Sequence, residues 1–318
     1  MTINNLTTEI INGRRLNKDD DLEFLKTAPL DELSFEADRL RAHFIGNTVD
    51  LCSIISGKSG KCTEDCKYCA QSAFNHTGCD VYELLDYETI HKKALSDMNE
   101  GVNRFAIVNS GWGPTDEEFE KLIDIYTRLS RELSISLCAS LGFLSTEQFK
   151  RLYDAGVRRY HNNIETSKNF FPHICSTHLF EDKLENIKRA QSVGLTVCSG
   201  GIIGMGETMD DRIDMALTLS SLSIRSIPIN TLIPIPNTPL EKLPLLTEEE
   251  ILRTVAVFRF INPEADIRLA AGRKLISGNG EAAYKSGASA AITGNMLTTT
   301  GSTIKNDIEL LTKLGRLE

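Results

Sequence analysis

Short apolar runs alternate with amphipathic stretches along most of this 318-residue chain. Eight runs have the length of buried strands, and they lie at 49–56, 104–110, 134–140, 157–163, 195–201, 226–233, 266–272 and 290–294. Between them, segments such as EEFEKLIDIYTRLSREL and TEEEILRTVAVFRFI repeat apolar residues at helical spacing. Gly156, Gly194 and Gly287 stand where such helices would end, just before the next strand. The pattern therefore predicts strands that alternate with helices.

Eight strand–helix units in about 250 residues are typical of an α/β fold of the (β/α)8 TIM type. A doubly wound open sheet is the alternative, because counting strands does not tell a closed sheet from an open one. Residues 15–45 carry apolar positions at roughly helical period and predict a short N-terminal helical extension. We therefore expect a helical extension at 1–45 and a barrel with a C-terminal tail at 46–318.

The composition of the chain excludes several classes of protein. With 41% hydrophobic and 25% charged residues it is neither disordered nor fibrous. A formal net charge of −9 argues against a broad surface for nucleic acid or anionic membrane. The N-terminal stretch lacks the order of a signal peptide, and no apolar run approaches the roughly 20 residues of a membrane helix. We predict a cytoplasmic protein with neither a nucleic-acid nor a membrane partner.

Three of the eight cysteines, Cys62, Cys66 and Cys69, gather in KCTEDCKYC at C-x3-C-x2-C spacing. In a reducing compartment such close spacing indicates a metal or catalytic site and not disulfides. Three thiolates on one loop can hold three irons of a 4Fe-4S cubane and leave the fourth iron open, whereas zinc sites more often pair C-x2-C knuckles. A structural zinc loop is the alternative. The loop follows the first predicted strand, at the end of the barrel where such enzymes place their chemistry.

The cysteine motif, with Tyr68 just before its last cysteine, resembles that of the radical S-adenosylmethionine (SAM) superfamily. GKCTEDCKYCAQS is followed in order by YHNNIETS, VCSGGIIGMGET, SIPINTLIPIPNTPL and IRLAAGR, and this set resembles the biotin synthase family over nearly the whole chain. The resemblance implies a sulfurtransferase in which SAM binds the open iron and yields 5′-deoxyadenosyl radicals. It implies sulfur insertion into dethiobiotin, with an auxiliary iron–sulfur cluster inside the barrel as the sulfur donor.

The same resemblance implies that Cys138, Cys198 and Arg268 are ligands of the auxiliary cluster. The family usually has a third cysteine where this sequence has Ala106, and a serine where it has Cys52. Alanine cannot ligate iron, so the usual site is not intact. Barrel interiors are filled in layers drawn from alternate strands, and we therefore expect Cys52 to share a layer with the other ligands and to replace the missing one.

Three thiolates spread around a barrel suit a 4Fe cluster better than a 2Fe cluster. We therefore predict an auxiliary cluster of the 4Fe type with an extra sulfide (4Fe-5S), and the alternative is a rearranged 2Fe-2S cluster on the same residues. A lone cysteine on a strand is often only a small core residue, and this interpretation stays open for Cys52. Cys79 and Cys175 lie on predicted loops near the barrel mouth, either as ordinary loop residues or within reach of a cluster or the substrate.

The resemblance also assigns binding residues. Asn163 and Asn230 match positions that bind the ureido group of dethiobiotin, and an amide side chain offers both a donor and an acceptor for that ring. Glu165 stands where the family often has an aspartate that contacts the ribose hydroxyls of SAM. The turn NSGW at 109–112 matches the one that binds the methionyl amine. The SAM-binding set is therefore Tyr68, through its backbone, with Asn109, Ser110 and Glu165.

Two further features are less specific. His161 stands where asparagine is common in the family, and we interpret it as a packing residue. Thr298, Thr299 and Thr300 in LTTTGS resemble a loop that covers the carboxylate tail of the substrate, although ordinary turn chemistry explains them equally well.

The resemblance further implies a homodimer and a reducing protein of the flavodoxin or ferredoxin type. A first competing interpretation is another radical SAM enzyme, of the hydrogenase-maturase or pyrrolysine-pathway kind. Such an enzyme would not be expected to keep Arg268 together with Cys138, Cys198 and the two asparagines. A second is a non-catalytic iron–sulfur carrier, which would not release 5′-deoxyadenosine from SAM.

Overall fold

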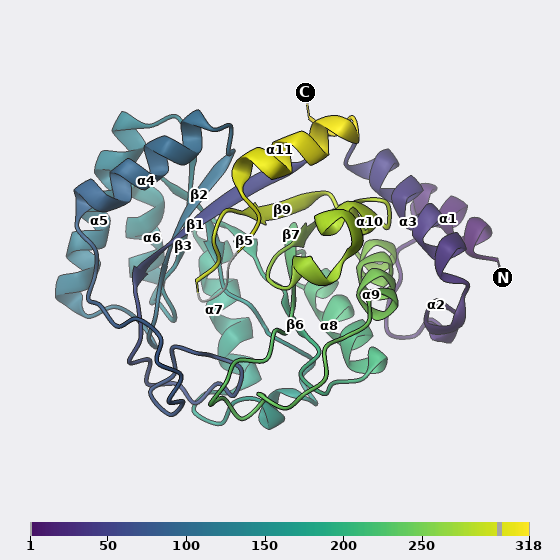
Figure 1. Cartoon of the computed structure of the whole chain (residues 1–318), viewed down its shortest axis with the longest axis horizontal. Coiled ribbons are helices and arrows are strands. Elements are labelled where there is room, and N and C mark those ends of the chain that lie inside the picture. The colour runs from purple at the N-terminus through teal and green to yellow at the C-terminus, as the bar shows by residue number, and fades with distance from the viewer. Residues whose placement is uncertain (1, 298–300, 318) are drawn as a thin grey trace.

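The computed structural model describes residues 2–297 and 301–317, and within them parallel strands close into a barrel (Figure 1). The strands pair in the order β5-β4-β3-β2-β1-β9-β8-β7-β6, and a further pairing of β5 with β7 closes the ring. The (β/α)8 barrel is thus confirmed, and the open sheet is wrong. The strands are β1 (Asp50–Lys58), β2 (Arg104–Asn109), β3 (Ser136–Ser140), β4 (Val157–His161), β5 (Thr196–Cys198), β6 (Gly201–Ile203), β7 (Ser226–Thr231), β8 (Asp266–Leu269) and β9 (Ala290–Thr293).

β5 and β6 are two halves of one barrel strand, which is why nine strands make an eight-membered ring. The break falls at Ser199 and Gly200, and both halves pair with β7. Helices cover the outside of the ring (Figure 1). They are α4 (Tyr87–Asn99), α5 (Asp116–Glu132), α6 (Thr146–Asp154), α7 (Phe180–Ser192), α8 (Met209–Ser221), α9 (Glu248–Ile261), α10 (Glu281–Tyr284) and α11 (Ile304–Lys313).

Local sequence signals fix where several helices begin and end. At the start of α5, Thr115 Oγ1 accepts a hydrogen bond from the Glu118 amide at 3.2 Å, and Glu118 Oε2 accepts one from the Thr115 amide at 2.9 Å. This reciprocal capping satisfies two amides that have no partner inside the helix. Gly156, Gly194 and Gly287 have φ of 105°, 89° and 103°, so the predicted helix-ending glycines are confirmed.

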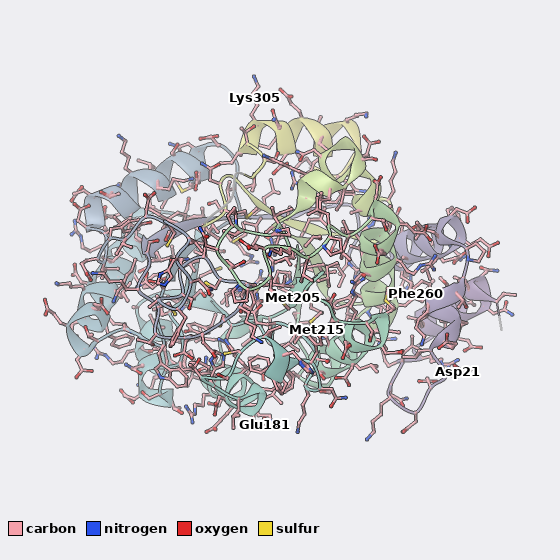
Figure 2. All side chains as sticks on the ribbon, turned by 60° about the horizontal axis from the view of Figure 1, so that its bottom comes forward. Asp21, Glu181, Met205, Met215, Phe260 and Lys305 are labelled. Atoms are coloured by element: carbon pink, nitrogen blue, oxygen red, sulfur yellow. The ribbon has the colours of Figure 1, made fainter. Side chains whose placement is uncertain are left out.

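The main core lies between the barrel and its helices. On β2, Phe105 and Ile107 are fully buried in this layer, whereas Ala106 belongs to a separate small cluster with Cys52 and Cys138. Successive strand residues point to opposite faces, so this alternation sends the two cysteines into the barrel. Figure 2 shows the same division for the whole chain, with Met205, Met215 and Phe260 buried and Asp21, Glu181 and Lys305 at the surface.

The N-terminal residues form three helices, α1 (Ile3–Ile11), α2 (Glu23–Thr27) and α3 (Leu30–Phe44). Of these, α3 packs against α9, and α1 packs against α3 (Figure 1). The sequence pattern predicted the helical character of 15–45 but not α1, whose Leu6 and Ile10 are fully buried. A division of the chain at residue 45 stays a prediction. No helix among the described residues is long and apolar enough to cross a membrane.

Candidate active site

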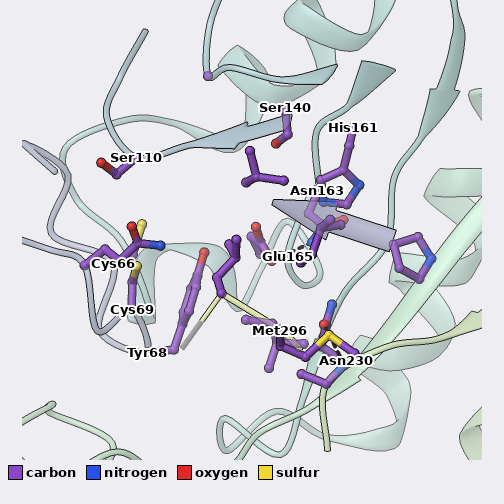
Figure 3. A pocket seen from close by; sticks show the side chains of 18 of the residues that line it. Cys66, Tyr68, Cys69, Ser110, Ser140, His161, Asn163, Glu165, Asn230 and Met296 are labelled. Carbon is purple, nitrogen blue, oxygen red and sulfur yellow. Dashed lines mark hydrogen bonds between the residues drawn. The ribbon is translucent and has the colours of Figure 1, made fainter. Parts of the chain in front are cut away.

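A cavity of about 390 Å³ opens at the barrel mouth and reaches the barrel interior. In Figure 3, Cys66 and Cys69 lie on one side of this cavity, and Asn163, Glu165 and Asn230 face it from the other. Every site residue predicted from the sequence lines it. They are Cys52, Cys62, Cys66, Tyr68, Cys69, Asn109, Ser110, Cys138, Asn163, Glu165, Cys198, Asn230 and Arg268.

The cysteine loop between β1 and α4 is held by its own backbone. The Cys62 amide donates to the Gln71 carbonyl at 3.0 Å, and the Asn75 side-chain amide donates to the carbonyls of Cys66 at 3.2 Å and Cys69 at 2.8 Å. None of the eight cysteines is in a disulfide. Burial raises the pKa of Cys69 to about 11, so this thiol stays protonated at neutral pH unless a positive metal centre takes its proton's place.

Inside the barrel, Cys52 of β1 and Cys138 of β3 pack against each other and against Ala106. The Cys52 thiol donates a hydrogen bond to Cys138, which raises the pKa of Cys52 and lowers that of Cys138. The positive charge of Arg159 lowers the pKa of Cys138 further. The buried pair is therefore already poised to hold one thiolate.

Cys198 of β5 stands across the barrel from this pair. Its Sγ lies 3.3 Å from Ser226 Oγ, which in turn accepts a hydrogen bond from Arg268 Nε at 3.3 Å. Burial raises the pKa of Cys198, but the hydrogen bond from His161 and the charge of Arg268 outweigh burial and bring it to about 7. The third inner thiol is thus readily deprotonated as well.

Three arginines surround the carboxylate of Asp50 beneath the inner thiols. Asp50 Oδ2 accepts from Arg268 Nη2 at 2.7 Å and from Arg104 Nε at 2.8 Å, and it lies 3.3 Å from Arg159 Nη1. Arg268 Nη1 also donates to the Asp50 and Ala291 carbonyls, each at 2.9 Å. Positive charge exceeds negative charge here, which favours an anionic group among the thiols.

Glu165 enters the cavity from a strained backbone, with φ of 70°. The conformation is fixed by hydrogen bonds from the Glu165 amide to the Gly200 carbonyl at 3.1 Å and from the Ile202 amide to the Glu165 carbonyl at 2.8 Å. A Cβ on Gly201 would come within 2.2 Å of that carbonyl oxygen, so this position requires glycine. Burial raises the pKa of the Glu165 carboxyl.

The two asparagines opposite the cysteine loop are oriented by backbone groups. Asn163 Oδ1 accepts from the Gly200 amide at 3.0 Å. Asn230 Oδ1 accepts from the Ala271 amide at 3.2 Å, and its Nδ2 donates to the Gly201 carbonyl at 3.2 Å. Each side-chain amide keeps an acceptor lone pair and an N–H for a ligand.

Asn109 lies at the end of β2 beside the cysteine loop. Neither its Oδ1 nor its Nδ2 has a hydrogen-bond partner among the described residues, although both atoms are buried. A buried amide without partners is costly, so a polar ligand is expected at this position. Next to it, Ser110 Oγ donates to the Gly60 carbonyl at 2.8 Å, and Trp112 stacks on Phe143 with ring centroids 4.1 Å apart.

Comparison with known proteins identifies the family. Residues 58–219 match the radical SAM superfamily, and residues 228–317 match the Biotin and Thiamin Synthesis associated domain. A biotin synthase from Alkaliphilus metalliredigens (strain QYMF) is 53% identical over 99% of both chains, and one from Clostridium perfringens (strain 13 / Type A) is 55% identical over 90% of both. The chain belongs to the biotin synthase family. It is therefore a radical SAM enzyme of the sulfur-inserting type, and the family implies a 4Fe-4S cluster and SAM.

Solved structures share the fold of this chain at low sequence identity. Methylornithine synthase (PylB) superposes with a TM-score of 0.85 at 20% identity, over 98% of this chain and 96% of that one. HydG, a maturase of the [FeFe]-hydrogenase, gives a TM-score of 0.80 at 17% identity, over 98% of this chain and 74% of that one. The fold alone therefore does not distinguish these enzymes, and the near-full-length relatives favour biotin synthase over the maturase-like alternative.

Several residues around the site escaped the sequence analysis. His161, interpreted from the sequence as a packing residue, lines the cavity and hydrogen-bonds Cys198. Arg159 and Lys183 also line the cavity, and both are basic residues in otherwise ordinary segments. Arg159 stands two positions before His161 in a predicted strand, so both side chains point to the same face of the barrel. This spacing is the one signal in the sequence that could have placed Arg159 in the cavity.

Three predicted features fall outside this cavity or outside the described residues. Neither Cys79 nor Cys175 is among its lining residues, although Cys175 lies against Cys66. The proposed loop over the substrate at Thr298–Thr300 lies outside the described residues.

We expect Asp50→Asn to lower the free energy of unfolding by about 3 kcal/mol, because removing one partner leaves buried guanidinium charges uncompensated. Urea unfolding of anaerobically purified protein measures this change. Asp124→Asn, at an exposed position on α5, is the control and is expected to change stability by less than about 0.5 kcal/mol. Equal stability of the two variants would show that the arginines do not depend on Asp50.

Proposed function

We propose that this enzyme converts dethiobiotin to biotin in the cavity between its two groups of cysteines. The observation that carries the proposal is that the cysteine loop, the three inner thiols and the paired asparagines all line one cavity. The SAM cluster would be held by Cys62, Cys66 and Cys69. The auxiliary cluster would be held by Cys52, Cys138, Cys198 and Arg268.

The cysteine loop fits a 4Fe-4S cluster because its three thiols are free and its backbone is already satisfied. When bound, that cluster supplies the electron that cleaves SAM. Asn109 and Ser110 are proposed to bind the methionyl amine, which would give the buried Asn109 amide the partner it lacks. Glu165 is proposed to accept hydrogen bonds from the ribose hydroxyls, and the Tyr68 backbone to contact adenine.

Asn163 and Asn230 are proposed to bind the ureido ring of dethiobiotin. Their amides are pinned by backbone groups and keep one donor and one acceptor each, which matches the N–H and C=O groups of a neutral ureido ring. A fixed partner on the scaffold limits the positions that the substrate carbons can take, and radical hydrogen abstraction depends on such positioning.

The inner site is proposed to hold an auxiliary cluster that supplies the sulfur, of the 4Fe-5S type with 2Fe-2S as the alternative. Two observations support the 4Fe type. The thiols come from β1, β3 and β5, so they surround the barrel axis, and Ala106 leaves β2 without a ligand. Arg268 is proposed as the fourth member of the site, where its charge, fixed by Asp50, balances the thiolates.

Other features of the enzyme remain proposals. We infer a homodimer and a flavodoxin or ferredoxin type of reducing protein from the family resemblance. A cytoplasmic location agrees with eight free cysteines, which a reducing compartment would maintain. We keep the division into a helical extension at 1–45 and a barrel at 46–318, since α3 ends at Phe44 and β1 begins at Asp50.

We expect Asn230→Ala to raise the KM for dethiobiotin about 10- to 100-fold, because the variant loses hydrogen bonds to a buried polar ring. Steady-state kinetics under anaerobic conditions measure the change. The KM for SAM is the internal control and should stay within about twofold, since Asn230 lies on the substrate side of the cavity. An unchanged KM for dethiobiotin would show that Asn230 does not bind this substrate.

The proposed function is tested by anaerobic turnover of reconstituted protein with SAM, reductant and dethiobiotin. We expect biotin together with 5′-deoxyadenosine, two molecules of the latter for each biotin. Release of 5′-deoxyadenosine without biotin would instead indicate another radical SAM enzyme. No release at all would indicate an iron–sulfur carrier.

A further inference from the structure

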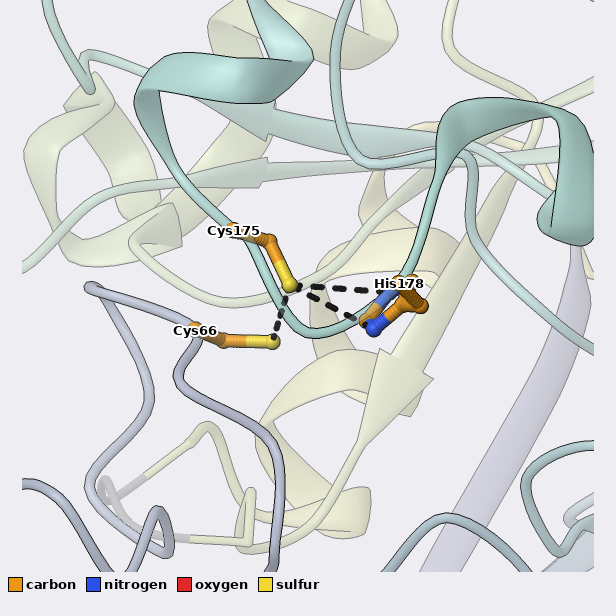
Figure 4. A group of neighbouring side chains, drawn as sticks. All are labelled: Cys66, Cys175 and His178. Carbon is orange, nitrogen blue, oxygen red and sulfur yellow. Dashed lines mark hydrogen bonds between the residues drawn. The ribbon is translucent and has the colours of Figure 1, made fainter.

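Cys66, Cys175 and His178 form a group of metal-ligating side chains at the edge of the cavity, which Cys66 and His178 line (Figure 4). Cys66 belongs to the cysteine loop, and the other two precede α7. The two Sγ atoms are 3.9 Å apart, and Cys175 Sγ lies 3.3 Å from His178 Nδ1 and 3.8 Å from its Nε2. One ligand atom from each residue lies within 4.8 Å of the others.

These spacings match the coordination of one ion. A tetrahedral Zn²⁺ ion with bonds of about 2.3 Å to sulfur and 2.0 Å to nitrogen sets two sulfurs roughly 3.8 Å apart, and a sulfur and a nitrogen roughly 3.6 Å apart. Thiolates on different irons of a cubane point away from each other and are farther apart. The pair formed by Cys66 and Cys175 is therefore spaced for a single ion and not for two corners of a cluster.

The histidine of this group is held in place by a carboxylate. His178 Nδ1 lies 2.6 Å from Glu64 Oε2, and the His178 side chain is only 3% exposed. A carboxylate on one ring nitrogen fixes the tautomer and leaves the other nitrogen, Nε2, to a metal. This carboxylate–histidine pairing is the usual surrounding of a metal-binding histidine.

The loop that carries Cys175 is fastened to the cysteine loop by a second carboxylate. Asp65 Oδ1 accepts from the amides of Ser176 at 2.8 Å and Thr177 at 3.2 Å, and it lies 3.2 Å from Cys175 Sγ. Cys175 itself is 4% exposed. The two loops are thus joined next to the three ligand atoms, independently of any cluster.

We propose that the cluster-free protein binds one thiophilic divalent ion of the zinc type through Cys66, Cys175 and His178, with the fourth position left to water. Such a site goes beyond sulfur insertion. Because Cys66 is also a proposed ligand of the SAM cluster, the ion and that cluster exclude one another. This consequence, unlike the ion site itself, rests on the proposed function.

The site is tested with full-length protein from which the clusters have been removed anaerobically by a chelator and a reductant. We expect one equivalent of Co²⁺ to give tetrahedral d–d bands and thiolate charge-transfer bands. Cys175→Ser and His178→Ala should weaken this binding about 100-fold, whereas Cys79→Ser, farther along the β1–α4 connection and outside the group, should leave it unchanged. Circular dichroism spectra of the variants check their folding, and Cys175→Ser nearly keeps the size of the side chain. The proposal would be overturned if Cys175→Ser and His178→Ala, like the control Cys79→Ser, left the Co²⁺ spectra unchanged.

X-ray absorption of the protein with one equivalent of Zn²⁺ identifies the ligands directly. We expect two sulfurs at about 2.3 Å and one histidine nitrogen at about 2.0 Å. Three sulfurs without a histidine would place the ion on the cysteine loop alone and would overturn the proposal.

Competition between the ion and the cluster is measured by iron uptake. Zinc-loaded wild type should take up iron at the SAM site more slowly than zinc-treated Cys175→Ser, and equal rates would overturn mutual exclusion. Zinc-free wild type that takes up no iron at all would contradict the proposed function, and the Co²⁺ result would still stand.

Discussion

Cys69→Ala is expected to lower the iron bound by anaerobically reconstituted protein by about four atoms per chain and to stop the release of 5′-deoxyadenosine from SAM. A cubane held by three thiolates on one loop loses a required ligand, and Cys79, the other cysteine between β1 and α4, does not line the cavity. Iron analysis and chromatography of the reaction mixture measure both effects.

Cys79→Ala is the matched control for this experiment. Cys79 is a free cysteine in the same connection between β1 and α4, and it does not line the cavity. It should keep both iron and SAM cleavage. A Cys69→Ala protein that still cleaves SAM at the wild-type rate would show that the cluster is held elsewhere.

Cys52→Ser is expected to uncouple the two halves of the reaction. The variant keeps the cysteine loop and should still release 5′-deoxyadenosine, but it should lose the auxiliary iron and form no biotin. The physical reason is that Cys52 and Cys138 are in contact inside the barrel, and an alcohol is a poor ligand for the irons of such a cluster. Iron analysis, Mössbauer spectra and a biotin assay measure the outcome.

The double variant Cys52→Ser with Ala106→Cys tests whether Cys52 replaces the ligand that Ala106 cannot provide, because it moves the cysteine back to position 106. Ala106 pairs with Cys138 in the β2–β3 register, so a cysteine there returns two ligands to adjacent strands. We expect about two auxiliary irons per chain in place of about four. Full biotin formation by Cys52→Ser alone would mean that Cys52 is only a core residue.

The sequence predicted the fold because its signals are local. Strand and helix periods follow from which side chains are buried, and glycines such as Gly156 mark helix ends through their positive φ. The helix α1 was missed because it is only nine residues long. Its Ile3, Leu6 and Ile10 recur at helical spacing, but the packing against α3 that buries them cannot be read from so short a segment.

The candidate site was predicted where residues carry motifs and missed where they do not. The cysteine loop and the asparagines lie in recognisable segments. In contrast, the pairing of Glu64 with His178 joins residues 114 positions apart, and the contact of three arginines with Asp50 depends on which way each strand faces. The contact of Cys175 with Cys66 likewise arises only when two loops meet at the barrel mouth.

The central claim is that two iron–sulfur clusters share one cavity, with Cys52 in place of the ligand that Ala106 cannot provide. An anaerobic crystal structure with SAM and dethiobiotin, phased on the anomalous signal of iron, tests it most directly. The account predicts one iron cluster on Cys62, Cys66 and Cys69 and a second between Cys52, Cys138 and Cys198. Iron density at the cysteine loop alone, or a second cluster that Cys52 does not contact, would contradict it.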